Sequence, residues 1–153
     1  MASSLSSVPP VWPSPRPDII GTFRPHAAAR GAINAIFYGK GELCSAGSRL
    51  LVEDSIHDAL IEKVVERAKK MTPGDPMDPN TTMGPLVSQE QADRVAGYIE
   101  VGKGEANLAA IGTKPTDAAL AGGYFVPPAI FSEATNDLRI AREEIFGPVM
   151  TVI

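Results

Sequence analysis

The sequence contains one cysteine, Cys44, among 153 residues. A single thiol cannot form a disulfide within the chain, which suits a reducing compartment, so we expect a cytoplasmic protein. No apolar run approaches the roughly 20 residues that a membrane helix needs, and the N-terminus lacks the basic start and apolar segment of a secretory signal. The net charge of −4 argues against a nucleic acid or an anionic membrane surface as a partner.

The remaining composition is that of a soluble globular domain, with 44% hydrophobic and 21% charged residues. The length allows one domain with a modest core. Residues 1–25 stand apart because they are rich in serine and proline, and proline removes backbone donors and fixes φ. We therefore expect a disordered tail over 1–25 and a folded part over 26–153.

Two amphipathic patterns in the first half of the chain predict helices. Residues 27–40 carry apolar side chains at i, i+4, i+7 and i+8, which places them on one helical face. A second helix is expected to begin where Ser55 and Asp58 form a capping-box pattern ahead of an apolar stripe. Prolines and glycines over 72–85 predict a stiff loop after that helix.

The second half of the chain predicts one long helix and one short helical turn. Ser88 begins the long helix, and Gln91 completes its cap. Gly102 and Gly104 are expected to end this helix. Asn136-Asp137 is expected to cap the short turn.

Four short apolar runs, 49–52, 107–111, 124–130 and 149–153, predict strands. The continuous apolar character of 49–52 suits a strand buried on both faces of a parallel sheet. In contrast, Pro127-Pro128 favours an edge or an irregular strand for 124–130. The order of helices and strands predicts an α/β layer, with helices packed against a mostly parallel sheet.

Cys44 lies between an expected helix and an expected strand. Its neighbours within 41–49 include glycine, serine and alanine, so little bulk surrounds the sulfur. A nucleophilic thiol needs such space, because a carbonyl carbon must approach to within about 3–3.5 Å. The alternative interpretation is that a lone free cysteine is a small buried hydrophobe.

Four segments in order resemble motifs of the aldehyde dehydrogenase superfamily. Gly41-x-x-Cys44-x-Ala46-Gly47-Ser48-Arg49 is similar to its nucleophile motif, and Glu143-Glu144-Ile145-Phe146-Gly147-Pro148-Val149 is similar to its cofactor-ribose motif. Gly84-Pro85-Leu86-Val87 and Gly123-Tyr124-Phe125-Val126-Pro127 fit the family's order and spacing. The resemblance covers about residues 27–153 and identifies 26–153 as part of that family's catalytic domain. The family's Rossmann-type half is expected to be absent, since no glycine-rich loop opens a βαβ unit.

The resemblance implies oxidation of an aldehyde to a carboxylic acid, with NAD or NADP as the acceptor and no metal. The Cys44 thiolate would attack the aldehyde to give a thiohemiacetal and then a thioester, which water cleaves, and the backbone N–H of Cys44 would help hold the oxyanion. Glu144 would accept hydrogen bonds from the nicotinamide ribose hydroxyls, and Phe146 would pack near the same ribose or ring. Without the resemblance, Glu143-Glu144 is interpreted as a solvated acidic pair and Phe146 as a core residue.

Two hypotheses remain open. In the first, the chain is part of an NAD(P)-dependent aldehyde dehydrogenase that is not competent alone, and its partners are an aldehyde and a complementary dehydrogenase chain. A fragment is expected because the position of the family's general base, about Val11, is not acidic and the chain ends inside the expected strand 149–153. In the second, the chain is an inactive folded remnant or an interaction module with at most a reactive thiol. Neither hypothesis identifies the aldehyde or decides between NAD and NADP.

Overall fold

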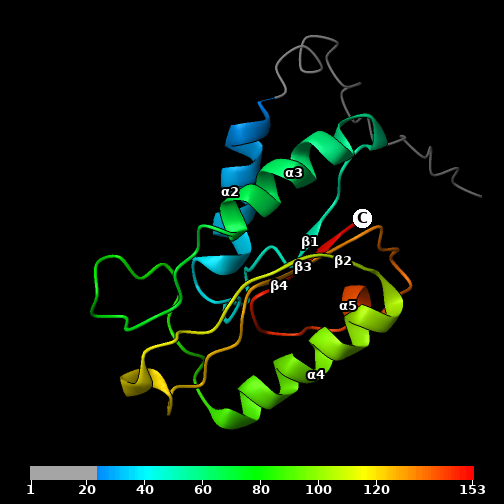
Figure 1. Ribbon diagram of the computed structural model, residues 1–153. Coiled ribbons are helices and arrows are strands. Elements are labelled where there is room, and N and C mark those ends of the chain that lie inside the picture. The colour runs from blue at the N-terminus through cyan, green and yellow to red at the C-terminus, as the bar shows by residue number, and fades with distance from the viewer. Residues whose placement is uncertain (1–23) are drawn as a thin grey trace, which may run out of the picture.

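The structure, a computed structural model, describes residues 24–153. The tail expected over 1–25 and the position near Val11 therefore fall almost entirely outside the described residues. The helices are α2 (Pro25–Phe37), α3 (His57–Ala68), α4 (Gln89–Glu105) and α5 (Arg139–Arg142). The strands are β1 (Arg49–Leu50), β2 (Asn107–Ile111), β3 (Ala129–Ser132) and β4 (Val149–Val152). α2 and α3 cover one face of the sheet, and α4 and α5 cover the other (Figure 1).

The sheet is mostly parallel, which confirms the expected α/β fold. The strand order is β1-β4-β3-β2, with β1 and β3 parallel to β4 and β2 antiparallel to β3. The register pairs Arg49 with Thr151 and Leu50 with Val152. Because β1 follows the Cys44 segment and β4 follows the Glu144 segment, this pairing brings two segments that are far apart in the sequence to the same part of the sheet.

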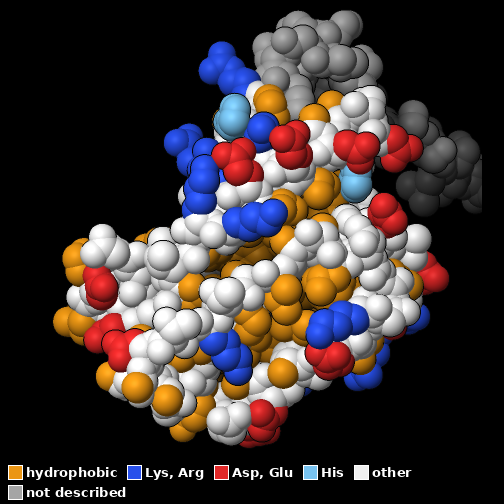
Figure 2. Space-filling view, in the orientation of Figure 1, with side chains coloured by type: hydrophobic (Ala, Val, Ile, Leu, Met, Phe, Trp, Pro, Cys, Tyr) orange, Lys and Arg blue, Asp and Glu red, His pale blue; other side chains and the backbone are white. Residues whose placement is uncertain are grey.

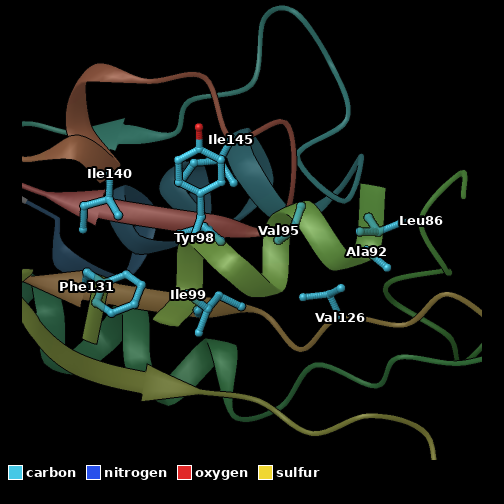
Figure 3. Close-up of a cluster of buried hydrophobic side chains, with 11 residues drawn as sticks. Leu86, Ala92, Val95, Tyr98, Ile99, Val126, Phe131, Ile140 and Ile145 are labelled. Carbon is cyan, nitrogen blue, oxygen red and sulfur yellow. The ribbon is translucent and has the colours of Figure 1, made fainter. Parts of the chain in front are cut away.

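Side chains of the two internal strands alternate between two hydrophobic clusters. Phe131 and Val149 belong to the cluster beneath α4, whereas Ile130 and Met150 belong to the cluster beneath α2 and α3. All four side chains are fully buried. Figure 3 shows the first cluster, in which Ile99 of α4 lies beside Phe131. Full burial of each such side chain contributes roughly 1.5–3 kcal/mol, so the two clusters fix the helices on the sheet.

The first two expected helices are present, but the expected cap of α3 is wrong. Ser55 lies in a 3-10 turn over Asp54–Ile56, and its hydroxyl donates to Glu53 Oε1 at 2.7 Å. The N-cap residue of α3 is Ile56, which makes no side-chain hydrogen bond to the helix. Figure 2 shows acidic and basic side chains along the outer side of α3, away from the apolar stripe that packs on the sheet.

α4 begins as the sequence predicts and ends later than it predicts. The hydroxyl oxygen of Ser88 accepts a hydrogen bond from the Gln91 N–H at 3.2 Å, which confirms the cap. The helix does not stop at Gly102. A Cβ there would lie 2.5 Å from the nearest atom of the Phe131 ring, so this glycine allows the helix to pack closely on β3. From residue 24 onward, no helix combines the length and apolarity needed to cross a membrane.

The environments predicted for two strands are wrong. β1 pairs only with β4 among the described residues, and Leu51 directly after it is 69% exposed, so β1 is an edge strand and is not buried on both faces. Of the predicted run 124–130, residues 124–128 form no regular strand, which fits the irregular alternative, but β3 itself is an internal strand whose four residues are all buried, so the edge alternative is wrong. Pro127 and Pro128 precede its first paired residue, Ala129, so the missing N–H groups remove no hydrogen bond from the sheet.

The short turn near residue 140 is present without its predicted cap. α5 has Leu138 at its N-cap position, with no side-chain hydrogen bond to the helix. The Asp137 carboxylate instead accepts a hydrogen bond from the Thr135 hydroxyl.

Candidate active site

Cys44 lies on an anchored loop between α2 and β1. The chain reverses after α2 through Lys40 and Gly41, whose φ angles are 59° and 71°. Beyond the cysteine, the Gly47 N–H donates to the Ala35 carbonyl at 2.9 Å, and the Ser48 carbonyl accepts from the Thr151 N–H at 2.8 Å. The loop is therefore tied to both α2 and β4. Its cysteine is exposed, so the thiol is not the small buried hydrophobe of the alternative interpretation.

A buried carboxylate ties the same loop to the segment before α4. The Glu42 side chain is only 7% exposed and forms an ion pair with Lys40 Nζ at 2.9 Å. It also accepts a hydrogen bond from the Val87 N–H at 3.1 Å. A buried carboxylate needs such partners because its desolvation is costly, and these two contacts fix the turn two residues ahead of the cysteine.

Glu144 and Phe146 lie on the loop between α5 and β4. The Glu144 side chain is exposed, Ile145 is buried in the cluster beneath α4, and Phe146 is half-buried. Phe146 has a φ of 58°, in the left-handed region. That region costs a residue with a Cβ roughly 1–2 kcal/mol, so contacts with the rest of the fold must hold the loop in this shape.

Two glycines allow the Glu144 loop to lie close to the Cys44 loop and to α4. At Gly41, where φ is 71°, a Cβ would lie 1.9 Å from the Gly147 carbonyl oxygen. At Gly147, a Cβ would lie 2.3 Å from Cγ2 of Val95 on α4. A side chain at Gly41 would push the two loops apart, and one at Gly147 would push the Glu144 loop away from α4, so both close approaches depend on glycine.

The two loops line one cavity of about 450 Å³. Cys44, Glu144 and Phe146 all contribute to its lining, although about a hundred residues separate the first from the other two. The structure therefore brings together all three residues that the sequence suggests. The roles assigned to them stay predictions, because a shared cavity does not by itself show chemistry.

The two adjacent glutamates have different environments. Glu143 accepts a hydrogen bond from the Tyr98 hydroxyl, and Nε of Arg139 donates to both of its oxygens at 3.0 Å. The Tyr98 hydrogen bond, followed by that of Arg139, holds the pKa of the Glu143 carboxyl below its ordinary value of 4.5. Glu143 therefore joins α4 and α5, and both glutamates line the cavity.

Sequence reasoning missed two residues that hold the Glu144 loop. Nε2 of Gln91 donates to the carbonyl oxygens of Phe146 at 2.7 Å and Ile145 at 3.2 Å. A guanidinium nitrogen of Arg94 donates to the Glu144 carbonyl at 2.7 Å. These contacts span 50 to 55 positions of sequence, so no local pattern indicates them. Gln91 is noticeable in the sequence only as the partner of the Ser88 cap.

Known proteins of one family are similar to this chain in sequence and in fold. The model of the aldehyde dehydrogenase family matches residues 22–153. A betaine aldehyde dehydrogenase of Mesorhizobium japonicum is 50% identical over 127 residues, which cover 82% of this chain and 26% of that protein. The aldehyde dehydrogenase citD of Monascus ruber is 48% identical over 124 residues, covering 80% of this chain and 25% of that protein.

Solved structures of aldehyde dehydrogenases have a fold similar to that of this chain. The aldehyde dehydrogenase KauB of Pseudomonas aeruginosa superposes with a TM-score of 0.78 at 48% identity, over 85% of this chain and 26% of that chain. A betaine aldehyde dehydrogenase of Staphylococcus aureus in complex with NAD+ superposes with a TM-score of 0.78 at 36% identity, over 84% and 26% of the two chains. The chain thus spans about a quarter of the length of these relatives. The match over residues 22–153 and the shared fold show that the chain belongs to the aldehyde dehydrogenase family.

Proposed function

We propose that the chain forms part of the catalytic domain of an enzyme that oxidises an aldehyde to a carboxylic acid, with Cys44 as the nucleophile. The observation that carries this proposal is the exposed Cys44 thiol in a cavity that Glu144 and Phe146 also line. The names of the relatives include betaine aldehyde dehydrogenases and other aldehyde dehydrogenases. They support an aldehyde substrate as a class.

Cys44 would act through its thiolate. The sulfur forms a bond to the carbonyl carbon, and the carbonyl electron pair moves to the oxygen, where the backbone N–H of Cys44 donates a hydrogen bond to the developing oxyanion. After the substrate carbon has been oxidised, Cys44 holds a thioester. Water then gives one proton to a general base as it adds to the acyl carbon, the carbon–sulfur bond breaks, and the acid and the free thiolate are released.

The cavity lining has groups that fit a nicotinamide nucleotide. An exposed carboxylate such as that of Glu144 can accept hydrogen bonds from two neighbouring ribose hydroxyls, and the half-buried Phe146 ring offers a flat apolar surface beside it. When bound, NAD or NADP supplies the acceptor for the hydride that leaves the substrate carbon. The complex of the Staphylococcus aureus relative with NAD+ supports NAD as a cofactor.

The chain spans about a quarter of the relatives' length, and in this proposal residues 26–153 supply the nucleophile and part of the cofactor site. A complementary dehydrogenase chain would supply the rest of the cofactor site and the general base. Without that base, the rate of aldehyde oxidation falls by a factor of roughly 10²–10⁴.

We assign the protein to the cytoplasm because its only cysteine carries a free thiol. The second candidate function, a folded chain with only a reactive thiol, is supported by the same exposure of Cys44.

The experiment that tests the nucleophile uses a nitrophenyl acyl ester. Attack by Cys44 releases nitrophenolate and leaves an acyl group on the sulfur, which peptide mass spectrometry locates. We expect the folded chain to acylate at Cys44 faster than the urea-denatured chain, because the cavity holds the carbonyl beside the sulfur. The Cys44→Ser variant is the control. Acylation that is no faster in the folded chain, or that persists in the variant, would contradict the role.

The same preparation separates the two candidate functions. With an aldehyde and NAD+ or NADP+, the chain alone is expected to give no increase in absorbance from the reduced cofactor. Addition of a relative that lacks the segment matched by residues 27–153 is expected to give an increase that the Cys44→Ser variant abolishes. If acylation occurs but complementation gives no increase, the chain has only a reactive thiol.

A further inference from the structure

The Gln91 side chain joins the first turn of α4 to the Glu144 loop. We propose that Gln91 is a positioning residue that holds Phe146 in the left-handed backbone conformation and so directs Glu144 and Phe146 into the cavity. The functional part of this inference rests on the cofactor role proposed for those two residues. The structural part rests on contacts within the chain.

The carbonyls of Ile145 and Phe146 converge on one amide group. Nε2 of Gln91 lies 2.7 Å from the Phe146 oxygen and 3.2 Å from the Ile145 oxygen. A side-chain amide carries two N–H donors, so it can satisfy both oxygens at once. Two consecutive carbonyls that point the same way repel each other unless a donor lies between them. Gln91 therefore offsets the unfavourable φ of 58° at Phe146.

The position of Gln91 is itself fixed by α4. Its backbone N–H donates to the Ser88 hydroxyl oxygen, which caps the helix. The next residue, Ala92, and Val95 one turn on are both buried in the cluster beneath α4. The helix therefore cannot rotate to follow a displaced loop, and the amide presents its donors at a defined place.

Neighbouring contacts hold the loop on either side of Phe146. Arg94, one turn along the same helical face, donates to the Glu144 carbonyl at 2.7 Å. Gly147 packs directly against Val95, and its carbonyl oxygen lies against Gly41 of the Cys44 loop. A change of backbone conformation at Phe146 would thus move the Glu144 loop relative to Cys44 as well as to α4.

Backbone NMR of the full chain tests the proposal. A positive φ places the amide and α protons of a residue close together and gives a strong intraresidue cross-peak. We expect this signature at Phe146 in the wild type and its loss or weakening in Gln91→Ala and Gln91→Glu. The first variant removes the donor, and the second replaces it with an acceptor of the same shape. Gln89→Ala is the matched control, since Gln89 lies on the same turn and its amide donates to Asp93 and not to the loop.

A second measurement needs no substitution. The side-chain amide protons of Gln91 are expected to exchange with solvent roughly two- to tenfold more slowly in the folded chain than in the urea-denatured chain, the factor by which one ordinary hydrogen bond shifts an equilibrium. Exchange at equal rates, or an unchanged Phe146 cross-peak in both Gln91 variants, would overturn the proposal. If the variants do not fold, the exchange rates in the wild type decide alone.

Nicotinamide mononucleotide separates this inference from the proposed function. If the cofactor role is right, the nucleotide shifts the Glu144 and Phe146 signals in the wild type and in Gln89→Ala, and shifts them less in Gln91→Ala. If it shifts neither signal while the Phe146 signature still depends on Gln91, the cofactor role fails and the positioning role stands. Equal shifts in all three proteins would contradict the functional part of the inference.

Discussion

Substitution of Gly41 by alanine should separate the two loops that line the cavity. The new Cβ would lie 1.9 Å from the Gly147 carbonyl oxygen, about 1.5 Å short of the 3.4 Å at which ordinary van der Waals contact begins. The obstructing atom belongs to the backbone, so no change of rotamer can relieve the overlap. A φ of 71° adds roughly 1–2 kcal/mol for a residue with a Cβ, and overpacking typically costs about 1–3 kcal/mol. We therefore expect Gly41→Ala to lower the free energy of unfolding by about 2–5 kcal/mol.

Urea denaturation followed by circular dichroism measures this change, and the rate of Cys44 acylation reports on the cavity. Gly31→Ala is the matched control. Gly31 lies within α2, and its Cβ would meet nothing within 4 Å. A glycine in the middle of a helix is less stable than alanine by roughly 0.5–1 kcal/mol, so the control should be slightly stabilised and acylate normally. If Gly41→Ala matched that control in both stability and acylation, the close approach of the loops would be refuted.

Two further substitutions test the packing and electrostatics around α4. Gly102→Ala should lower the free energy of unfolding by about 1–3 kcal/mol, because the new Cβ would lie 2.5 Å from the Phe131 ring on β3. Gly97→Ala on the same helix is the control, since its Cβ would meet nothing within 4 Å. Equal urea midpoints for the two variants would contradict this packing. Tyr98→Phe should raise the pKa of Glu143, since the Tyr98 hydrogen bond is the first cause of its lowering. The stability that Glu143 contributes is present above its ordinary pKa of 4.5 and is lost as the pH falls through the lower pKa of the folded chain. An NMR titration of the Glu143 carboxyl carbon with the same midpoint in both proteins would exclude the assigned cause.

Elements defined by local patterns could be predicted from the sequence. The apolar stripe over 27–40 predicts α2, and the Ser88 cap predicts the start of α4. The apolar runs 107–111 and 149–153 predict β2 and β4. Each follows from residues within a few positions of one another. The α/β fold was also predicted, from the order of helices and strands, and the family was predicted from motifs with fixed spacing.

Features that depend on tertiary contacts could not be predicted. The glycine at 102 resembles a helix end but allows close packing on Phe131. The prolines at 127 and 128 resemble strand breakers but stand just outside the paired residues of β3. In the site, the residues of the motifs were predicted and Gln91 was not, because only the folded chain brings its amide to the loop carbonyls. The roles of Cys44, Glu144 and Phe146 stay predictions.

The account depends most on the Cys44 loop and the Glu144 loop forming one site, and a nitroxide spin label tests this directly. Cys44 is the only cysteine and is exposed, so the label attaches there without any substitution. With the label oxidised, the amide signals of Glu144 and Phe146 should be among the most strongly broadened in the chain, and reduction of the label should restore them. Sharp Glu144 and Phe146 signals beside the oxidised label would contradict the account.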